Sequence, residues 1–221
     1  MSMFKAKSLG WLVAAIALCV GLVACSGSGK VPPVQTGQFV DAAVIGANYV
    51  NSPSGLSGVT DANGNYNYMA GDTVTFSIGN IVFPSTSAKG VVSPFDLAGI
   101  EYTPGTSPTD FLNPVVINIS RLLQTLDTDG DPDNGITLDS SITGSAYNFN
   151  QSLTSFQSEF KSDFPTLNLV STTDALTHLF AELDALEAGN SGGGDGGSLV
   201  FTGAGAAQLK TDATFTPGVG E

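Results

Sequence analysis

The hydrophobic positions of this chain follow two different periods, and the first of them is the period of β-strands. Residues 72–78 alternate strictly between polar and apolar side chains, which is typical of a half-buried antiparallel strand. Gly79-Asn80 then suits a two-residue turn into a second strand at 81–83. This part of the sequence therefore predicts a β-hairpin.

Similar signals surround these two strands. Asn63-Gly64 lies between the short strand-like runs 58–60 and 65–68, which predicts a second hairpin with a tight turn. Residues 39–50 supply a leading strand. Short strands with turns at this spacing predict a small antiparallel β-sandwich over residues 38–110.

After about residue 111 the apolar positions recur at the helical period instead. Three segments show this spacing, and they are 115–126, 149–160 and 176–183. Ser171 stands three residues before Asp174 and predicts the N-cap of the third helix, which we expect Gly189 to close. Each helix has one apolar stripe and must pack on its neighbours or on the sheet. The sequence predicts an α+β fold with a three-helix subdomain over residues 111–188.

The N-terminus indicates export. Lys5 and Lys7 precede roughly fifteen mostly apolar residues. A helix needs about 20 such residues to span a membrane, whereas a run of this length is typical of a signal peptide. The run ends in Leu22-Val23-Ala24-Cys25, which resembles the lipobox of bacterial lipoproteins. This resemblance implies that residues 1–24 are removed and that Cys25 is acylated as the new N-terminus.

Two alternatives to acylation stay open: an ordinary signal peptide that ends near Ala24, and an uncleaved anchor. By resemblance to the sorting rule of Gram-negative lipoproteins, Ser26 and Gly27 favour the outer membrane, with either face exposed. Acyl chains contribute about 0.8 kcal/mol per buried methylene, so several chains hold a soluble domain on a bilayer. Cys19 leaves with the leader, so no thiol remains for a disulfide or a nucleophile.

Gly, Ser and Pro mark the connections between these parts. Residues 25–37 contain the cysteine and a flexible tether, and residues 189–198 are a Gly-rich linker. Residues 199–221 are too few to close a sheet, and we expect a short β-like segment or a disordered tail.

The charge of the chain limits its partners. The formal net charge is −13, and the chain without its two leader lysines is still more acidic. Such a charge argues against nucleic acid or anionic lipid headgroups as partners and favours divalent cations or basic surfaces. Solubility alone explains it equally well.

Two stretches resemble known families. The run 58–68, followed by 70–74, contains a Thr-Asp-x-x-Gly-x-aromatic pattern and resembles the carboxypeptidase regulatory-like, prealbumin-type β-sandwich. Such modules serve as spacers, adhesive repeats and carbohydrate-associated domains, so the resemblance implies a fold and leaves the function open. The stretch 118–136 resembles a recurring segment of uncharacterised proteobacterial lipoproteins, and this likeness extends over about residues 37–188.

Aspartates are concentrated in one loop between the first two predicted helices. The residues that we expect to bind calcium are Asp127, Asp129, Asp131, Asp133 and Asp139. Carboxylates on alternate residues of a loop converge on one hard cation, and calcium accepts about six to eight oxygen ligands. The loop is not an EF-hand, because Pro132 occupies the position that needs glycine when Asp127 is the first ligand. It resembles the shorter Asp-x-Asp-x-Asp loops of extracellular calcium modules.

An ordinary polar loop is the alternative to a calcium site. Aspartates also form Asx-turns and cap backbone amides in exposed loops, although four of them in seven residues repel one another without a counter-ion. Asp61, Asn63 and Asn65 on the predicted hairpin tip form a weaker candidate. For Arg121, the sequence allows a salt bridge to the loop or packing on the helix surface.

Catalytic patterns are weak in this chain. His178 lies between apolar helix positions and is expected to be a half-buried helix residue rather than a general base. Carboxylate pairs for a glycosidase would come from Asp96, Glu101, Asp110 and Glu159, as in any acidic chain. We therefore predict no catalytic residues.

These patterns favour an outer-membrane lipoprotein that displays a non-catalytic, calcium-stabilised structural or adhesive binding module. The alternative is an accessory lipoprotein that binds a polysaccharide or an outer-membrane protein complex, and a hydrolase is a more remote one. A glycan-binding protein would expose aromatic residues, for which Tyr49, Tyr66, Tyr68 and Tyr102 are the candidates. An assembly factor would expose a large apolar patch.

Overall fold

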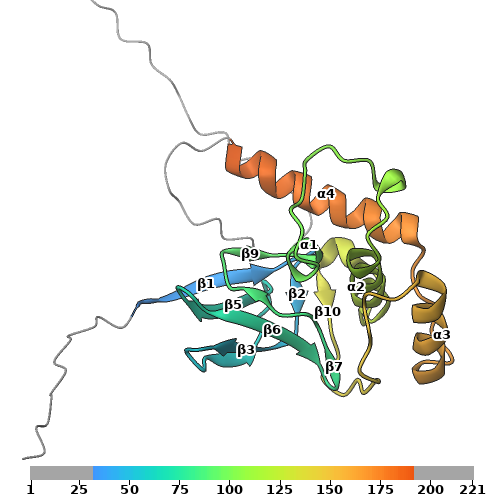
Figure 1. Cartoon of the computed structure of the whole chain (residues 1–221), viewed down its shortest axis with the longest axis horizontal. Coiled ribbons are helices and arrows are strands. Elements are labelled where there is room, and N and C mark those ends of the chain that lie inside the picture. The colour runs from blue at the N-terminus through green and yellow to red at the C-terminus, as the bar shows by residue number, and fades with distance from the viewer. Residues whose placement is uncertain (1–31, 192–221) are drawn as a thin grey trace, which may run out of the picture. The chain divides into compact units, whose positions relative to one another are not determined.

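Strands fill the first part of the described chain and helices the second (Figure 1). The computed structural model describes residues 32–191. The strands are β1 (Val34–Phe39), β2 (Val44–Ile45), β3 (Asn48–Ser52), β4 (Ser57–Val59), β5 (Asn65–Met69), β6 (Thr73–Ile78), β7 (Ile81–Val82), β8 (Thr86–Ser87), β9 (Val91–Val92) and β10 (Ile136–Thr137). The helices are α1 (Pro94–Leu97), η1 (Pro108–Asp110), α2 (Pro114–Thr125), η2 (Pro132–Asn134), α3 (Leu153–Asp163) and α4 (Thr172–Ser191). The predicted α+β class is confirmed.

Several expected segments lie outside the described residues. These are the leader 1–24, Cys25 with most of the tether, most of the Gly-rich linker, and the tail 199–221. Strand β1 begins at Val34, so the last residues of the expected tether belong to the sheet.

The strands form three sheets. One has the order β5-β1-β9, the second has the order β4-β3-β6-β7 with β8 beside β6, and β2 pairs with β10. The predicted hairpin around Gly79-Asn80 is confirmed, because Ile78 pairs with Ile81 and Ser77 with Val82. The strictly alternating residues of β6 place Val74, Phe76 and Ile78 in the core.

The second predicted hairpin is wrong. Strand β4 pairs with β3, and β5 pairs with β1, so the two strands on either side of Asn63-Gly64 belong to different sheets. The turn itself is present, because the Asp61 carboxylate accepts hydrogen bonds from the backbone N–H groups of Asn63 and Asn65. Local turn chemistry therefore gives the turn correctly but not the strand partners. The expected leading strand 39–50 is also divided, into the end of β1, β2 and the start of β3.

Aromatic rings fill the space between the two larger sheets. Phe39 of β1 stacks on Phe76 of β6 with ring centroids 4.2 Å apart, and Tyr66 of β5 meets Phe76 edge-on at 5.2 Å. Tyr49 of β3 contacts Tyr66 at 5.8 Å. The two sheets thus share one core.

Helix α2 connects this core to α4. Its side chains Ile119, Leu122 and Leu123 belong to the core of the sheets, whereas Val116 and Ile117 pack against α4. The helix begins at the expected place because Asn113 accepts hydrogen bonds from the N–H groups of the first turn. The three predicted helices are all present, and Figure 1 shows α4 lying along one side of the sheets and α2.

The sequence predicts the start of α4 correctly but not its end. Ser171 accepts a hydrogen bond from the Asp174 N–H at 3.1 Å, which confirms the N-cap. The helix continues to Ser191, so Gly189 does not close it. Among the described residues, no helix has the length and apolar character needed to cross a membrane.

Candidate functional site

The Asp-rich loop runs from the end of α2 through η2 to β10. Asp127 and Leu138 form an isolated β-bridge that closes the loop at its base. The Asp127 carboxylate also accepts a hydrogen bond from the backbone N–H of Thr137 at 2.9 Å. Strand β10 pairs with β2, so the sheet holds the base of the loop in place.

Two carboxylates of the loop lie side by side. Asp127 is 8% exposed, and its Oδ2 has no hydrogen-bond partner among the described residues. Burial, together with the neighbouring Asp129 carboxylate, raises the pKa of Asp127. Hydrogen bonds from the Asn134 side chain and the Asp131 N–H lower the pKa of Asp129. The negative charge of each carboxylate therefore makes ionisation of the other less favourable.

The other three predicted ligands do not join this pair. Asp139 accepts a hydrogen bond from the Ser141 N–H, and Asp133 lies beside His178. Within residues 32–191, no three acidic, histidine or cysteine side chains converge as a metal site would require. The bonds that Asp129 and Asp139 accept from the N–H groups two residues on are Asx-turns, the alternative expected from the sequence.

Asp61, the weaker candidate, also serves its own turn. Its carboxylate accepts hydrogen bonds from the backbone N–H groups of Asn63 and Asn65 and from the Asn65 side chain. Slight burial acts to raise the pKa of Asp61, but these hydrogen bonds outweigh it and lower that pKa.

His178 and Arg121 have structural partners. The His178 Nδ1 lies 3.3 Å from the Asp133 Oδ1, and the His178 side chain is 10% exposed. Arg121 donates from Nε to the Val170 carbonyl at 2.7 Å and from Nη2 to the Gln157 side chain at 3.3 Å. Of the two roles that the sequence allows for Arg121, the salt bridge to the loop is not formed among the described residues, and its contacts join α2 to α3 and to the segment before α4.

The four tyrosines do not form an exposed aromatic surface. Tyr49, Tyr66 and Tyr68 are buried between the sheets. Tyr102 donates a hydrogen bond from its hydroxyl to Asp184 on α4 at 2.6 Å. The expected glycan-binding face of exposed tyrosines is thus not formed.

The carboxylates considered for catalysis are divided among separate elements. Asp96 on α1 accepts hydrogen bonds from the backbone and hydroxyl of Ser93 and pairs with Lys89 at 2.5 Å. Glu159 on α3 accepts a hydrogen bond from Gln151, and Asp110 lies in η1. These contacts stabilise local structure and give no shared reaction centre.

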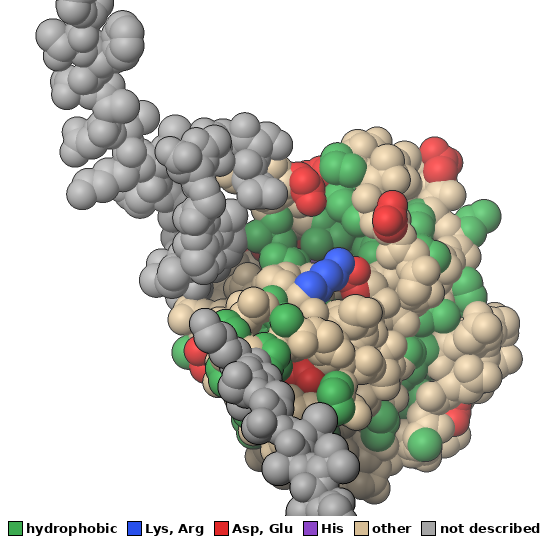
Figure 2. All heavy atoms as spheres, turned by 60° about the vertical axis from the view of Figure 1, so that its left-hand side comes forward, with side chains coloured by type: hydrophobic (Ala, Val, Ile, Leu, Met, Phe, Trp, Pro, Cys, Tyr) green, Lys and Arg blue, Asp and Glu red, His purple; other side chains and the backbone are tan. Residues whose placement is uncertain are grey.

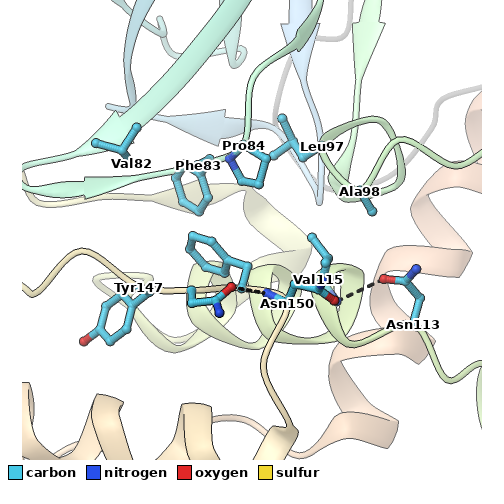
Figure 3. Close-up of a pocket in the computed structure, with 11 residues that line it drawn as sticks. Val82, Phe83, Pro84, Leu97, Ala98, Asn113, Val115, Tyr147 and Asn150 are labelled. Atoms are coloured by element: carbon cyan, nitrogen blue, oxygen red, sulfur yellow. Dashed lines mark hydrogen bonds between the residues drawn. The ribbon is translucent and has the colours of Figure 1, made fainter.

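A cleft of about 480 Å³ was not predicted from the sequence. One wall consists of residues 82–84 with the end of α1, and the other consists of residues 147–150 with the start of α2 (Figure 3). Phe83 and Phe149 stack across the two walls with centroids 5.4 Å apart. No single stretch of sequence carries this site, because its walls are distant in the chain.

Hydrogen bonds hold the asparagine-rich wall of this cleft. The Asn118 side chain on α2 donates to the carbonyls of Phe149 and Gln151. The Asn148 Oδ1 accepts from the Asn150 N–H, and the Asn113 Oδ1 caps α2. The side-chain Nδ2 groups of Asn148 and Asn150 make no hydrogen bond to another described residue.

A buried acid was also missed by the sequence analysis. Asp41 lies fully buried just after β1, where its Oδ1 accepts a hydrogen bond from Gln124 at 2.9 Å. Gln124 also donates to the Ala175 carbonyl on α4. Burial raises the pKa of Asp41 well above its ordinary value, against the effect of its hydrogen bonds.

Comparisons with protein-family models, with curated proteins and with solved structures found no match for this chain.

Proposed function

We propose that the chain is a lipoprotein of the outer membrane, acylated on Cys25, which displays a non-catalytic structural or adhesive binding module. In this proposal the two larger sheets form a prealbumin-type sandwich, and α2, α3 and α4 form a subdomain packed on it. The aromatic contacts between the sheets and the position of α2 support this arrangement. The absence of a match leaves the resemblance to known families a proposal as well.

The observation that carries the binding role is the pair of adjacent carboxylates in the Asp-rich loop. Asp127 is buried beside Asp129 and has one oxygen without a partner. We propose that calcium binds between these two carboxylates and draws further loop oxygens toward itself. A ligand set of this kind suits calcium, which accepts carboxylates and carbonyls in loose geometry. Calcium would then stiffen the loop between α2 and β10.

Thermal unfolding of the full chain in detergent tests the calcium site. With a dissociation constant on the order of 0.1 mM, about 10 mM calcium stabilises the folded chain by roughly 2.7 kcal/mol. We expect Tm to rise by several degrees over its value in EDTA. The double variant Asp127→Asn with Asp129→Asn is expected to lose this rise.

The matched control is Asp110→Asn, which removes one carboxylate from η1 outside the loop. It is expected to keep the full calcium effect. If the wild-type chain shows no rise, the loop is an ordinary set of Asx-turns. If Asp110→Asn loses the rise as well, the effect comes from overall charge rather than from the loop.

Acylation is tested separately in cells. Mass spectrometry of the mature protein is expected to find an acylated Cys25 as the first residue, in the outer-membrane fraction. The Cys25→Ser variant is expected to leave that fraction. An unmodified N-terminus near residue 25 would instead establish an ordinary signal peptide.

An accessory lipoprotein that binds a polysaccharide is the second candidate. The cleft between residues 82–84 and 147–150 favours it, because this cleft combines apolar walls with amide groups. A hydrolase has no comparable support among the contacts described above.

A further inference from the structure

The side chains that line the cleft of Figure 3 are all uncharged. One wall of the cleft includes Phe83 and Leu97, and the other includes Asn148 to Asn150. The chain segments that form these walls contain no Asp, Glu, Lys or Arg, except for Asp96 next to Leu97. A chain with a net charge of −13 thus presents a neutral surface here. A charged ligand would have no partner at this site, so the ligand that fits is neutral.

The two kinds of side chain in the cleft complement two kinds of ligand group. Phe83, Leu97 and Phe149 are almost fully buried and form an apolar floor. The Asn150 side chain is exposed at the rim and makes no hydrogen bond to another described residue, so its amide is available as donor and acceptor. A ligand with amide or hydroxyl groups can hydrogen-bond to these amides, whereas a purely apolar ligand cannot.

The site is formed before any ligand arrives. Asn118 holds the backbone of Phe149 and Gln151 with two hydrogen bonds, and Asn113 holds the start of α2. The volume of about 480 Å³ lies within the usual range of small-molecule sites, which is roughly 300–1,000 Å³. A rigid, open cleft of this size selects ligands by shape and hydrogen bonding.

Figure 2 shows another face of the molecule, on which uncharged side chains and backbone also prevail over acidic groups.

We propose that this cleft binds a neutral glycan that carries N-acetyl groups. The acetyl methyl lies against the accessible apolar lining of Val82 and Pro84, which the stacked rings of Phe83 and Phe149 support from below, and the amide and hydroxyl groups of the sugar hydrogen-bond to the asparagine rim. The inference deepens the binding role proposed above, but it does not depend on the calcium loop.

Calorimetric titration of the full chain in lipid nanodiscs tests this site. N,N′-diacetylchitobiose is expected to bind, and cellobiose, which has the same linkage without acetyl groups, is expected to bind at least tenfold more weakly. Equal affinity for the two sugars would overturn the proposal. Binding of hexanol in place of either sugar would assign the cleft to alkyl chains and would overturn it too.

Two variants locate the binding within the cleft. Asn150→Ala removes an exposed rim amide and is expected to weaken the disaccharide about fivefold, the loss of one hydrogen bond. Ala98→Leu fills the wall at the end of α1 and is expected to abolish binding. Ala70→Leu adds the same bulk at an exposed alanine outside the cleft and is expected to bind like the wild type. Unchanged binding by both cleft variants would overturn the assignment.

The outcome can be separated from that of the calcium site. The variant with Asp127→Asn and Asp129→Asn is expected to bind the disaccharide with unchanged affinity. A chain that gains stability with calcium but binds no sugar overturns this inference alone.

Discussion

Asp41 illustrates how one buried carboxyl group connects distant parts of this molecule. Its side chain is fully buried just after β1. The Gln124 side chain of α2 donates one hydrogen bond to the Asp41 carboxyl group and another to the Ala175 carbonyl of α4. Ser120 on α2 is also near, and Glu182 on α4 adds a negative charge that further raises the pKa of Asp41. A single aspartate among apolar neighbours gives no sequence signal of this burial, because the residues that bury it follow much later in the chain.

Asp41 is expected to make stability depend on pH above about pH 4. Because the pKa of Asp41 is raised on folding, the folded chain holds a proton that the unfolded chain has released. Stability from this group is therefore complete below the unfolded pKa of about 4 and falls as pH rises toward the folded pKa. The Asp41→Asn variant keeps the hydrogen bond to Gln124 and is expected to lack this fall.

Urea unfolding at pH 4, 6 and 8 measures the effect as the difference between wild type and Asp41→Asn. Folding lowers the pKa of other carboxylates, such as Asp72 and Asp163. These groups make the free energy of unfolding rise with pH below about pH 4. They do so in both proteins, so their effect cancels in the difference. A constant difference across this range would show that Asp41 is not protonated in the folded chain.

At the scale of elements, the sequence predicts what is decided locally. The β6–β7 hairpin is confirmed, and the segments with helical spacing coincide with α2, α3 and α4, because periodicity and turn residues suffice for them. The pairing of β5 with β1 involves strands about 30 residues apart, and no local pattern specifies it. The cleft was missed for the same reason, and the Asp-rich loop was located correctly although only two of its carboxylates meet.

Gly79 in the β6–β7 hairpin gives a prediction at this scale. Its φ is +54°, and a Cβ here would collide with the Ile142 carbonyl oxygen. Gly79→Ala is expected to destabilise the chain by about 2 kcal/mol or more, because backbone strain and a steric clash add. Urea unfolding measures the loss.

Gly71 is the matched control for Gly79. It also has a positive φ, of +90°, but a Cβ there would meet no atom within 4 Å. Gly71→Ala is therefore expected to cost only the backbone strain, about 1 kcal/mol. An equal loss at both positions would mean that the contact between the hairpin and the segment at Ile142 adds nothing.

At the scale of the whole molecule, the sheets share one core with α2 and α3, and α4 packs on a second cluster to which α2 also contributes. Phe39 and Phe76 of the sheets belong to the same buried cluster as Leu122 of α2 and Phe156 of α3. The sequence suggested a boundary near residue 110 from the change of period alone. A change of period marks a change of element type and does not require a separate core.

We therefore expect residues 38–110 and 111–188 to unfold together. Far-ultraviolet circular dichroism follows mainly the helices, and near-ultraviolet dichroism follows the tyrosines, of which Tyr49, Tyr66 and Tyr68 are buried between the sheets. The two signals are expected to give coincident urea transitions, as a cooperative unit requires. Helices that melt first would establish two independent domains.

If Cys25 is acylated as proposed, the early start of β1 limits how far this strand can lie from the membrane. The folded part begins at Val34, roughly nine residues after Cys25, and such a length of chain spans at most about 30 Å when fully extended. With Cys25 acylated, the start of β1 would lie within this distance of the bilayer surface.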